Sequence, residues 1–470
     1  MLGRPIPMSP WPHRQPGLGR PSDPLLTPAT APRAWSWLKL LGPTLLGYAL
    51  LGKGWAYLGW PPIFIGELTL LGGLTLLVLS GDWRRIFDVP ASWALAALGA
   101  WGTFRTIPFV STHGVDALRD AAVWGYGAFA LVSCGGILAR PERLGLALQW
   151  YQQFARIFLP VIPLVWLARR FLADYLPCWP GTNVPLVDAK GGDVFVHLGS
   201  ILAFWVAGFA GPVGSLRVTL MAACVALVGT FDRGGLLSYL AVSAACLVHR
   251  PFDRSIWRMA AAAFFGIVLL TLLNVHVQMP GREREISSEQ IINNVLSIAG
   301  SSDAGDLDGT KRWRLEWWGV IADYTVFGEH FWAGKGFGVN LADDDGFQCN
   351  ADGSVRSPHN VHMTFLARTG VPGLLLWALV QGAWAAGVLR GYVLSRIAGD
   401  GAWSGCFLFL GTSWMAFLIN ASFDVFLEGP MGGAWFWTLY GMGLAAIRVQ
   451  RLDPGALISG PLPEVRDLPR

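Results

Sequence analysis

The feature that most constrains the fold of this chain is a succession of long apolar segments. A helix needs about 17 to 25 apolar residues to cross the hydrocarbon core of a membrane, and about twelve segments approach that length. Charged residues make up 14% of the 470 residues, whereas soluble domains carry about 25%. We therefore predict an all-α polytopic membrane protein with about 12 transmembrane helices. The apolar segments lie at about residues 37–57, 61–80, 91–109, 115–138, 145–171, 193–211, 215–231, 235–249, 258–276, 359–389, 403–421 and 432–448.

One long polar stretch, at about residues 277–358, interrupts this series. Residues 1–33 are rich in Pro and Arg without an apolar run, which indicates a disordered tail rather than a cleavable secretory signal. We predict a cytoplasmic tail, nine transmembrane helices, a periplasmic loop region with amphipathic helices that forms a cap, three more transmembrane helices and a second cytoplasmic tail. The bounds of these parts are residues 1–34, 35–276, 277–358, 359–450 and 451–470.

Lys and Arg in the short loops predict the orientation, because cytoplasmic loops carry an excess of both. With the N-terminus in the cytoplasm, most basic loop residues fall inside, and alternate loops such as 111–116 carry none. The polar stretch then lies outside, and His359 opens a helix at the outer membrane surface. Lys53, Arg169, Arg170 and Arg233 are exceptions. The residues placed inside are Arg4, Arg14, Arg20, Arg33, Arg84, Arg85, Arg140, Arg143, Arg217, Arg250, Arg254, Arg258, Arg390, Arg396, Arg448 and Arg451.

Several ionisable residues fall inside the apolar segments, where each costs at least ~2.5 kcal/mol at the bilayer centre unless it is paired or hydrated. In this topology nearly all of them lie in the outer half, and Arg156 is the exception. A one-sided set favours a hydrated cavity open to the outer face. The alternative is interfacial snorkelling and ion pairing, such as Arg119 with Glu67. The outer set is Glu67, Arg105, Arg119, Asp120, His197, Asp232, Arg233 and Asp424.

Arg233 is the most informative of these residues. It stands in Asp-Arg-Gly-Gly at the outer tip of a hairpin between two apolar segments, against the positive-inside bias. The two glycines allow a tight turn and close approach of a ligand to the backbone. A guanidinium there suits a phosphate, because its planar fork makes bidentate contacts. The alternative is an interfacial Arg that binds lipid head groups.

The outer region contains patterns that are weak when taken alone. Residues 309–324 have apolar residues at helical spacing, which predicts an amphipathic helix lying on the membrane. Residues 332–340 are a glycine-rich turn that follows no strand and is therefore no nucleotide loop. The acidic run 343–345 lacks the spacing of a calcium loop and is predicted to be a solvated turn. His359 and His362 can share a helix face, but two ligands without a third make no zinc site.

The six cysteines divide into two groups. Four lie in membrane segments and are interpreted as small apolar residues. Cys178 and Cys349 fall outside, where disulfides persist, so the sequence leaves open whether they form a bridge. The membrane cysteines are Cys134, Cys224, Cys246 and Cys406.

Taken in order, these motifs resemble the O-antigen ligase and O-antigen polymerase superfamily, polytopic glycosyltransferases with their active site at the periplasmic face. The resemblance covers about residues 38–448. Members usually have Ser before the hairpin Arg, whereas this chain has Asp232, which can pair with Arg233 or position it. The motifs are "TFDRGG" (230–235), "RLEWW" (314–318), "GKGFG" (334–338) and "HN" (359–360) followed by "RTGVPGLLL". Two further stretches look like the exopolysaccharide-type branch: "GKGWAYLGWPPIFIGEL" (52–68) and "DALRDAAVWGYGAFAL" (116–131).

The resemblance implies a GT-C-like fold in the bacterial inner membrane and transfer of a glycan from an undecaprenyl-pyrophosphate donor. The acceptor would be a hydroxyl on lipid A core or on a growing polysaccharide. His359 would act as the base or acceptor-orienting group, with inversion at carbon one, because imidazole changes charge near neutral pH. Arg233 and Arg314 would stabilise the leaving diphosphate without a metal or another cofactor. Further substrate contacts are expected from Arg312, Asp232, Asn360, Arg119, Glu67 and Asp424.

Other functions remain open at this stage. A polymerase uses the same donor as a ligase and differs only in its acceptor, so the sequence does not separate the two. A polysaccharide transporter or flippase predicts binding groups near the membrane midplane and repeats that relate the two halves, and neither is evident. A non-catalytic component of polysaccharide export predicts that His359 can be replaced without effect. The expected partners are the lipid-linked glycan, its acceptor and membrane lipids, and no nucleic acid.

Overall fold

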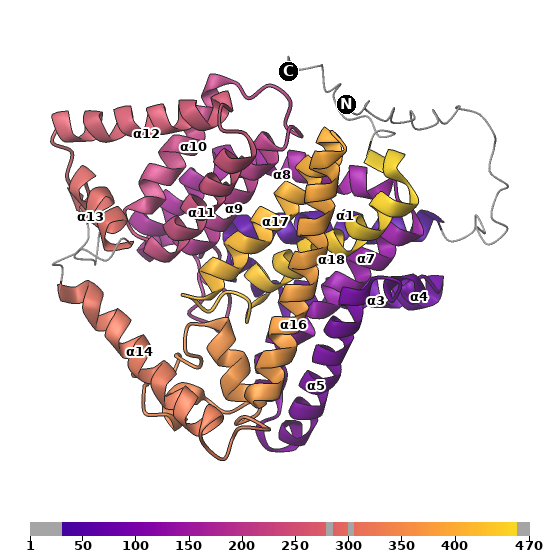
Figure 1. Cartoon of the computed structure of the whole chain (residues 1–470). Helices are drawn as coiled ribbons and strands as arrows, with labels where there is room; N and C mark the ends of the chain where they lie inside the picture. The colour runs from indigo at the N-terminus through magenta and orange to yellow at the C-terminus, as the bar shows by residue number, and fades with distance from the viewer. Residues whose placement is uncertain (1–30, 279–284, 299–304, 458–470) are drawn as a thin grey trace, which may run out of the picture.

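The computed structural model describes residues 31–278, 285–298 and 305–457, and most of the predicted N-terminal and C-terminal tails lies outside these ranges (Figure 1). The described part is mostly helical. Its strands form two antiparallel pairs, β1 (Gly59–Trp60) with β2 (Ile63–Phe64) and β3 (Val277–Gln278) with β4 (Glu285–Ile286). The helices are α1 (Ala31–Leu51), α2 (Lys53–Ala56), α3 (Ile65–Ser80), α4 (Trp83–Ile86), α5 (Pro90–His113), α6 (Val115–Gly125), α7 (Gly127–Ala139), α8 (Arg143–Phe171), η2 (Ala173–Tyr175), α9 (Gly191–Val206), α10 (Ser215–Gly229), α11 (Arg233–His249), α12 (Arg254–Leu272), α13 (Ser288–Ile298), α14 (Gly305–Val326), α15 (Leu341–Asp344), α16 (Val361–Ile397), α17 (Gly401–Ala421), α18 (Pro430–Leu452) and η3 (Pro454–Leu457).

Helices occupy most of each apolar segment that the sequence indicates. Within the described ranges, α12, α16 and α17 are long and apolar enough to cross a membrane, and α6 with α7 would add a fourth span. Shorter apolar helices accompany them, among them α3, α9 and α10. The chain is therefore a mostly helical protein with several candidate membrane spans, and the full number of about twelve spans stays a prediction.

Two predicted segments are interrupted, and the local sequence explains where. Residues 61–64 belong to the β1–β2 turn rather than to a helix, since Pro61 and Pro62 have no amide hydrogen to donate, and α3 begins only at Ile65. The segment 115–138 is divided at Tyr126 into α6 and α7, whose axes differ by 44°. Both breaks lie beside apolar residues of helical periodicity, which is why periodicity alone did not reveal them.

The break within α16 changes the environment of His359. Gly370 has φ 70° and ψ −174°, a backbone conformation that is open to glycine and strained for other residues. Across this break Trp377 Nε1 donates to His362 Nδ1 at 3.0 Å. In a straight helix these residues would be about 22 Å apart. The segment 361–369 therefore folds back on the rest of α16. The sequence predicted that His359 opens the membrane helix directly, whereas His359 precedes a short helix that the break at Gly370 separates from the rest of α16.

The core lies around α9, every residue of which is buried. A helix that is apolar on all sides must be surrounded by protein or lipid, and here α11, α17, α8 and α10 pack around it. At the N-terminal ends of α9 and α11 the backbones nearly touch, because a Cβ on Gly235 would lie 2.7 Å from the Cα of Gly192. This packing fixes the ends of two helices that contribute to the candidate site.

The helix predicted over 309–324 is present within α14, which runs along the lower left of the molecule (Figure 1). Trp317 and Ile321 are fully buried and pack with Leu366 and Ala367 of α16. Trp317 also stacks on Phe347 with a ring distance of 5.5 Å. One face of this helix therefore packs on protein instead of on a membrane surface.

Candidate functional site

Asp424, in the loop between α17 and α18, is the centre of the candidate site. Its carboxylate lies 3.5 Å from Nδ1 of His359 and 3.3 Å from Nζ of Lys190. Burial raises the pKa of Asp424, but the charge of Lys190 and the contact with His359 outweigh it, so the net pKa is below its ordinary value. The charge of Asp424 likewise raises the pKa of Lys190. The carboxylate is thus ionised and joins an imidazole to an ammonium group.

His359 is held in an unusual backbone conformation with φ 53°, which non-glycine residues seldom adopt. On one side, Trp318 Nε1 of α14 donates to the carbonyl of Pro358 at 2.9 Å. On the other side, the Asn360 side chain caps α16 by accepting from His362 N and Met363 N. Such strain persists only where the surroundings enforce it. The contacts of Pro358 and Asn360, on either side of His359, hold its imidazole in the direction of Asp424.

Arg314 reaches the same cluster from α14. Burial lowers the pKa of its guanidinium, while the nearby carboxylates of Asp424 and Asp232 oppose that effect. Its Nε is buried and has no hydrogen-bond partner among the described residues. Arg312, by contrast, is exposed and donates to Glu316 at 2.7 Å. The helix thus directs Arg314 toward Asp424 and Arg312 toward solvent.

Asp232 and Arg233 form the start of α11. Asp232 Oδ1 accepts from the backbone N–H of Gly235 at 2.7 Å, so this acid caps the helix. Burial raises the pKa of Asp232, and the charge of Asp424 adds to that effect. A Cβ on Gly191 would lie 2.9 Å from the Cβ of Asp232, which shows how closely the start of α9 approaches. Arg233 is the first residue of α11 and lies at this junction.

Three helices begin at this cluster: α9 after Lys190, α11 at Arg233 and α16 after Asn360. The N-terminus of a helix carries partial positive charge, which attracts anions. Asp232 and Asn360 already cap part of the N–H groups of α11 and α16. Together with the basic side chains, these N-termini can hold a ligand with several negative charges. The imidazole beside them can take up a proton.

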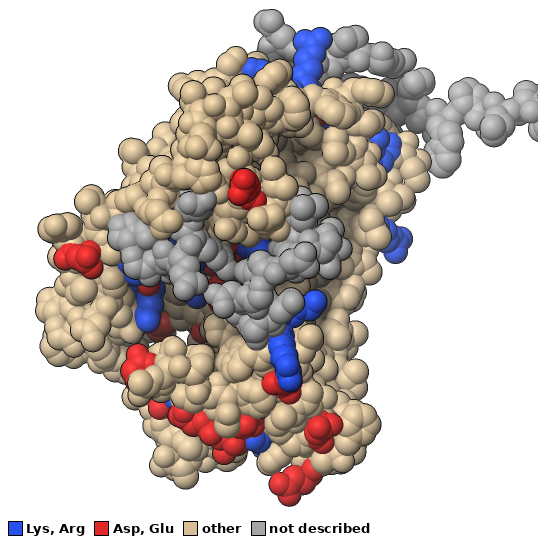
Figure 2. Space-filling model, turned by 90° about the vertical axis from the view of Figure 1, so that its left-hand side faces the viewer, with Lys and Arg blue, Asp and Glu red and all other residues tan. Residues whose placement is uncertain are grey.

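Figure 2 shows the molecule from the side of α12, α13 and α14. Acidic side chains gather over the lower part of this face, and basic side chains lie at the edge of the hollow above them. Exposed acidic residues of α14 and the turn that follows are Glu316, Asp323 and Glu329. The acidic lower part of this face disfavours an anionic ligand.

Two of the expected substrate contacts, Arg119 and Glu67, are not part of the cluster around Asp424. Arg119 is half-exposed and pairs with Asp116 at 3.1 Å and Asp120 at 3.6 Å. Glu67 accepts from the Tyr126 hydroxyl at 2.8 Å and from the Phe64 amide at 3.1 Å, at the start of α3. The pair between Arg119 and Glu67 that the sequence allowed is therefore wrong, and each residue binds its own local partners.

Other charged residues of the predicted outer set are also used structurally. His197 is buried among the rings of Phe154, Phe158 and Trp435, so it is a core residue rather than part of a hydrated cavity. Arg105 donates to the Ala333 carbonyl at 2.7 Å. Arg156, which did not fit the one-sided pattern, is exposed on α8. The single hydrated cavity predicted for all of these charges is thus replaced by several separate environments.

Asp120 is the centre of a buried network that the sequence did not reveal. It accepts from Arg356 and Arg368 at 3.0 Å each, and from the Gly338 amide at 3.1 Å. Arg368 also donates to the carbonyls of Gly336 and Val339. The glycine-rich turn 332–340 therefore has a structural role: its carbonyls bind Arg368 of α16.

The acidic run 343–345 differs from the solvated turn that was predicted. The side chain of Asp345 is fully buried, where it accepts from Trp317 Nε1 at 2.7 Å and pairs with Lys335. A buried carboxylate needs such partners, because an unpaired charge is costly to bury. Asp345 therefore connects α14, which carries Arg314, to Lys335 of the glycine-rich turn.

Lys190 and Asp193 were missed as candidate site residues. Lys190 is basic and lies on the predicted outer side, so it breaks the same positive-inside rule that drew attention to Arg233. Asp193 is a buried acid in the first turn of α9, and its Oδ1 has no hydrogen-bond partner among the described residues. The positive-inside rule applied to every segment end would have found Lys190, and the cost of burying a charge would have found Asp193.

Cys178 and Cys349 are exposed free thiols, so the bridge that the sequence left open is not formed. Among the described residues there is no group of three His, Cys, Asp or Glu side chains that could hold a metal ion.

The middle of the chain matches a known protein family. Residues 218–378 match the family model described as O-Antigen ligase. The matched range runs from α10 into α16 and includes Asp232, Arg233, Arg314 and His359, whereas Lys190 and Asp424 lie outside it. No curated protein matches the chain.

Proposed function

We propose that this multi-pass membrane protein transfers a glycan from undecaprenyl pyrophosphate to a hydroxyl acceptor. The proposal is supported by the match of residues 218–378 to the O-antigen ligase family model, in line with the motifs of the sequence. The transfer takes place at the periplasmic face of the bacterial inner membrane, with lipid A core or a growing polysaccharide as acceptor. The observation that carries the proposal is the contact of His359 with Asp424 beside Lys190 and Arg314.

The diphosphate of the donor is bound by Arg233, Arg314 and Lys190 together with the N-termini of α9 and α11. Diphosphate is a good leaving group whose negative charge grows as the bond to the sugar breaks, so fixed cations stabilise the transition state. The support for this role is the shared position of these groups: Lys190 pairs with Asp424, and Arg314 is attracted by Asp424 and Asp232. No resident metal is required in this scheme.

His359 takes the proton of the acceptor hydroxyl. Its Nδ1 faces Asp424, which leaves Nε2 as the nitrogen that accepts the proton. The acceptor oxygen forms the new bond to carbon one of the donor sugar. The bond from that carbon to the diphosphate oxygen breaks, and its electron pair stays on the diphosphate. Attack opposite the leaving group inverts the configuration. Asp424 acts as a positioning residue for His359, and Asn360 holds the helix start next to it.

Arg312, Asp232, Arg119 and Glu67 have weaker support as substrate contacts. Arg312 pairs with exposed Glu316, and Asp232 caps α11. Arg119 and Glu67 bind Asp116 and Tyr126, respectively. We therefore assign Asp232 a positioning role for Arg233 and keep the other three as outer contacts of a long glycan.

The test is a glycolipid gel, with analysis of lipid-linked intermediates, from a strain that lacks this gene and carries either the wild type or His359→Asn. Asn is a suitable replacement because it tolerates a positive φ, so the backbone is retained. Full-length glycan that accumulates on the carrier while the acceptor stays bare identifies a ligase. Single repeats on a decorated acceptor identify a polymerase. Unchanged surface glycan in the deletion strain would contradict glycosyl transfer and favour a transporter.

A further inference from the structure

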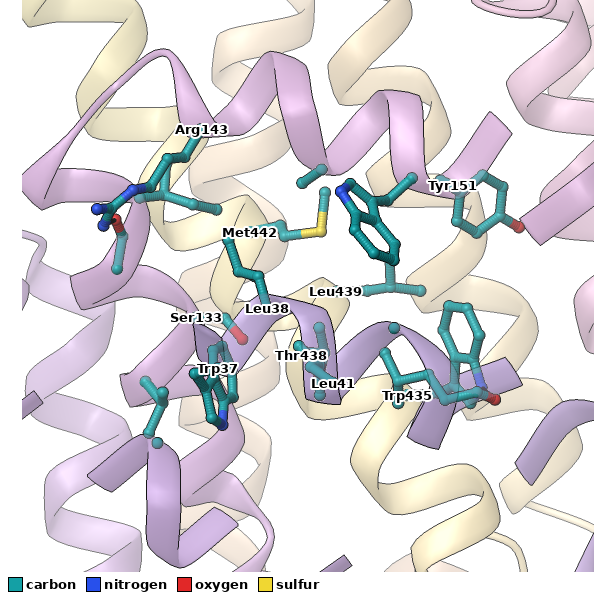
Figure 3. A pocket seen from close by; sticks show the side chains of 18 of the residues that line it. Trp37, Leu38, Leu41, Ser133, Arg143, Tyr151, Trp435, Thr438, Leu439 and Met442 are labelled. Carbon is teal, nitrogen blue, oxygen red and sulfur yellow. Dashed lines mark hydrogen bonds between the residues drawn. The ribbon is translucent and has the colours of Figure 1, made fainter. Parts of the chain in front are cut away.

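A second site is suggested by a cavity of about 370 Å³ between α1, α3, α7, α8 and α18. Figure 3 shows it from close by: the side chains of Trp37, Leu38, Leu41, Trp435 and Met442 point into or along it. The cavity is within the size range of small-molecule sites, about 300 to 1,000 Å³. Its lining is mostly aliphatic and aromatic, which suits a hydrocarbon chain.

This cavity is remote from the candidate catalytic cluster. Arg143, the first residue of α8, lines it. Arg169, near the other end of α8, pairs with Asp188 at 3.0 Å, two residues before Lys190 of the cluster. Arg143 and Arg169 are about 39 Å apart along the helix, which exceeds the hydrocarbon thickness of about 30 Å. Arg143 therefore marks the end of the cavity that lies toward the membrane face opposite the cluster.

Polar groups without partners line the same cavity. The hydroxyls of Ser133 and Thr438 and Nε of Arg143 are buried and have no hydrogen-bond partner among the described residues. These residues are only 5%, 6% and 4% exposed. A buried donor that lacks a partner costs about 1 to 3 kcal/mol, so a small movement of these side chains toward acceptor oxygens in the cavity would relieve that penalty.

Arg143 and Ser133 both lie near Gly136 of α7. Arg143 donates through a terminal nitrogen to the carbonyl of Gly136 at 2.6 Å, and Ser133 lies about one helical turn from Gly136 on α7. With a phosphate at Arg143, the acyl chain would lie along the apolar lining of the cavity, which includes Leu41 and Met442.

The charge at this end of the cavity favours an anionic lipid. Arg140 lies near Arg143, and Arg85 donates to the carbonyl of Leu138 at the end of α7. Asp82 and Glu142 neutralise part of this charge. Three basic groups against two acidic ones leave a positive surplus, and an arginine that is already buried binds phosphate in bidentate fashion without further ordering.

We propose that this cavity binds one acyl chain of an anionic glycerophospholipid from the leaflet opposite the catalytic face, with the lipid phosphate at Arg143. The bound lipid completes the packing of α1, α3, α7 and α8. This site does not depend on the reaction at the other face, because none of the residues assigned to that reaction lines the cavity.

The test compares wild type with Gly136→Leu, which fills the cavity. A Cβ on Gly136 meets nothing within 4 Å, and Gly136 lines the cavity. Gly99→Leu on α5 is the matched control, because its Cβ also meets nothing within 4 Å and Gly99 is not part of the lining. Both changes replace a helical glycine, so their effects on helix propensity cancel in the comparison.

Full-length protein is equilibrated with detergent micelles that contain equal amounts of phosphatidylglycerol and phosphatidylcholine, and bound lipid is measured by native mass spectrometry. We expect a single retained phosphatidylglycerol in wild type and Gly99→Leu, and none in Gly136→Leu. Arg143→Gln should lower the preference for phosphatidylglycerol about tenfold.

A thermal scan with added phosphatidylglycerol provides a second reading. The Tm of wild type and Gly99→Leu should rise with lipid, and that of Gly136→Leu should stay constant. Equal lipid retention in wild type and Gly136→Leu would overturn the proposal. So would retention of an isoprenoid diphosphate from the expression host in place of the phospholipid, or an Arg143→Gln variant with unchanged lipid preference.

Discussion

Replacing Asp424 by Asn tests whether this carboxylate positions His359. The amide keeps the size of the side chain but removes the charge that lies 3.5 Å from Nδ1 of His359. An amide can also present an N–H to that nitrogen, which would favour the wrong imidazole tautomer. Carboxylates that orient metal-bound histidines contribute about 10- to 100-fold, and we take the same range for the orientation of His359 by Asp424. We expect kcat for glycan transfer to fall by about that factor.

The same change should have little effect on folding. At the 3.3 Å between Asp424 and Lys190, two unit charges attract by about 1 kcal/mol in water. Both side chains are partly exposed, so the pair contributes at most about 1 kcal/mol to the free energy of unfolding. Because the folded pKa of Asp424 is lowered, this contribution is present above the unfolded pKa of about 3.9 and is lost as pH falls through the folded value.

The assay is transfer from a purified lipid-linked glycan, with Tm measured on the same samples. Asp174→Asn is the matched control, because Asp174 is exposed on η2 and is not part of the cluster. A strong loss of kcat with an unchanged Tm would support a positioning role. Wild-type turnover by Asp424→Asn would refute it, and a large loss of Tm would show that the residue acts through folding.

Three further predictions follow from named contacts. Arg314→Lys should raise KM for the lipid-linked donor about tenfold, because Lys lacks the planar fork. Arg312→Lys should raise it much less, because Arg312 is an exposed outer contact that keeps its charge in this variant; an equal effect of both variants would contradict the assignment. Gly235→Ala should lower the free energy of unfolding by about 1 to 3 kcal/mol, because the new Cβ would lie 2.7 Å from Gly192 Cα. Gly99→Ala is the control and should not destabilise the fold, and denaturant or thermal unfolding measures both variants. Transfer by the purified protein should be unchanged after treatment with EDTA, and a loss that added Mg²⁺ restores would contradict the metal-independent scheme.

The helices could be predicted from the sequence, because apolar runs of this length have few alternatives. The breaks at Pro61–Pro62, Tyr126 and Gly370 could be placed less well. Gly370 stands in an apolar stretch whose helical periodicity continues without interruption. The contact of Trp377 with His362 reveals that the chain folds back there. A tertiary contact of this kind leaves no periodic signal.

The candidate site was partly accessible to sequence reasoning. Arg233 and Asp424 were found because charge inside apolar segments is costly, and Arg314 and His359 were found through the family motifs. Lys190 was missed. Arg314 was preferred to Arg312 for the catalytic role only through the family motif "RLEWW" (314–318). That distinction depends on which face of α14 packs on α16, which Trp317 and its partner Asp345 determine.

The central claim is that His359 takes a proton from the acceptor at a diphosphate site. The most direct test is transfer by the purified protein, in liposomes, of glycan from undecaprenyl pyrophosphate to lipid A core extracted from the deletion strain. Wild type should form the glycosylated product, and His359→Asn should bind the donor with unchanged affinity but form product at least about 100-fold more slowly. Product formation by His359→Asn at the wild-type rate would contradict the account.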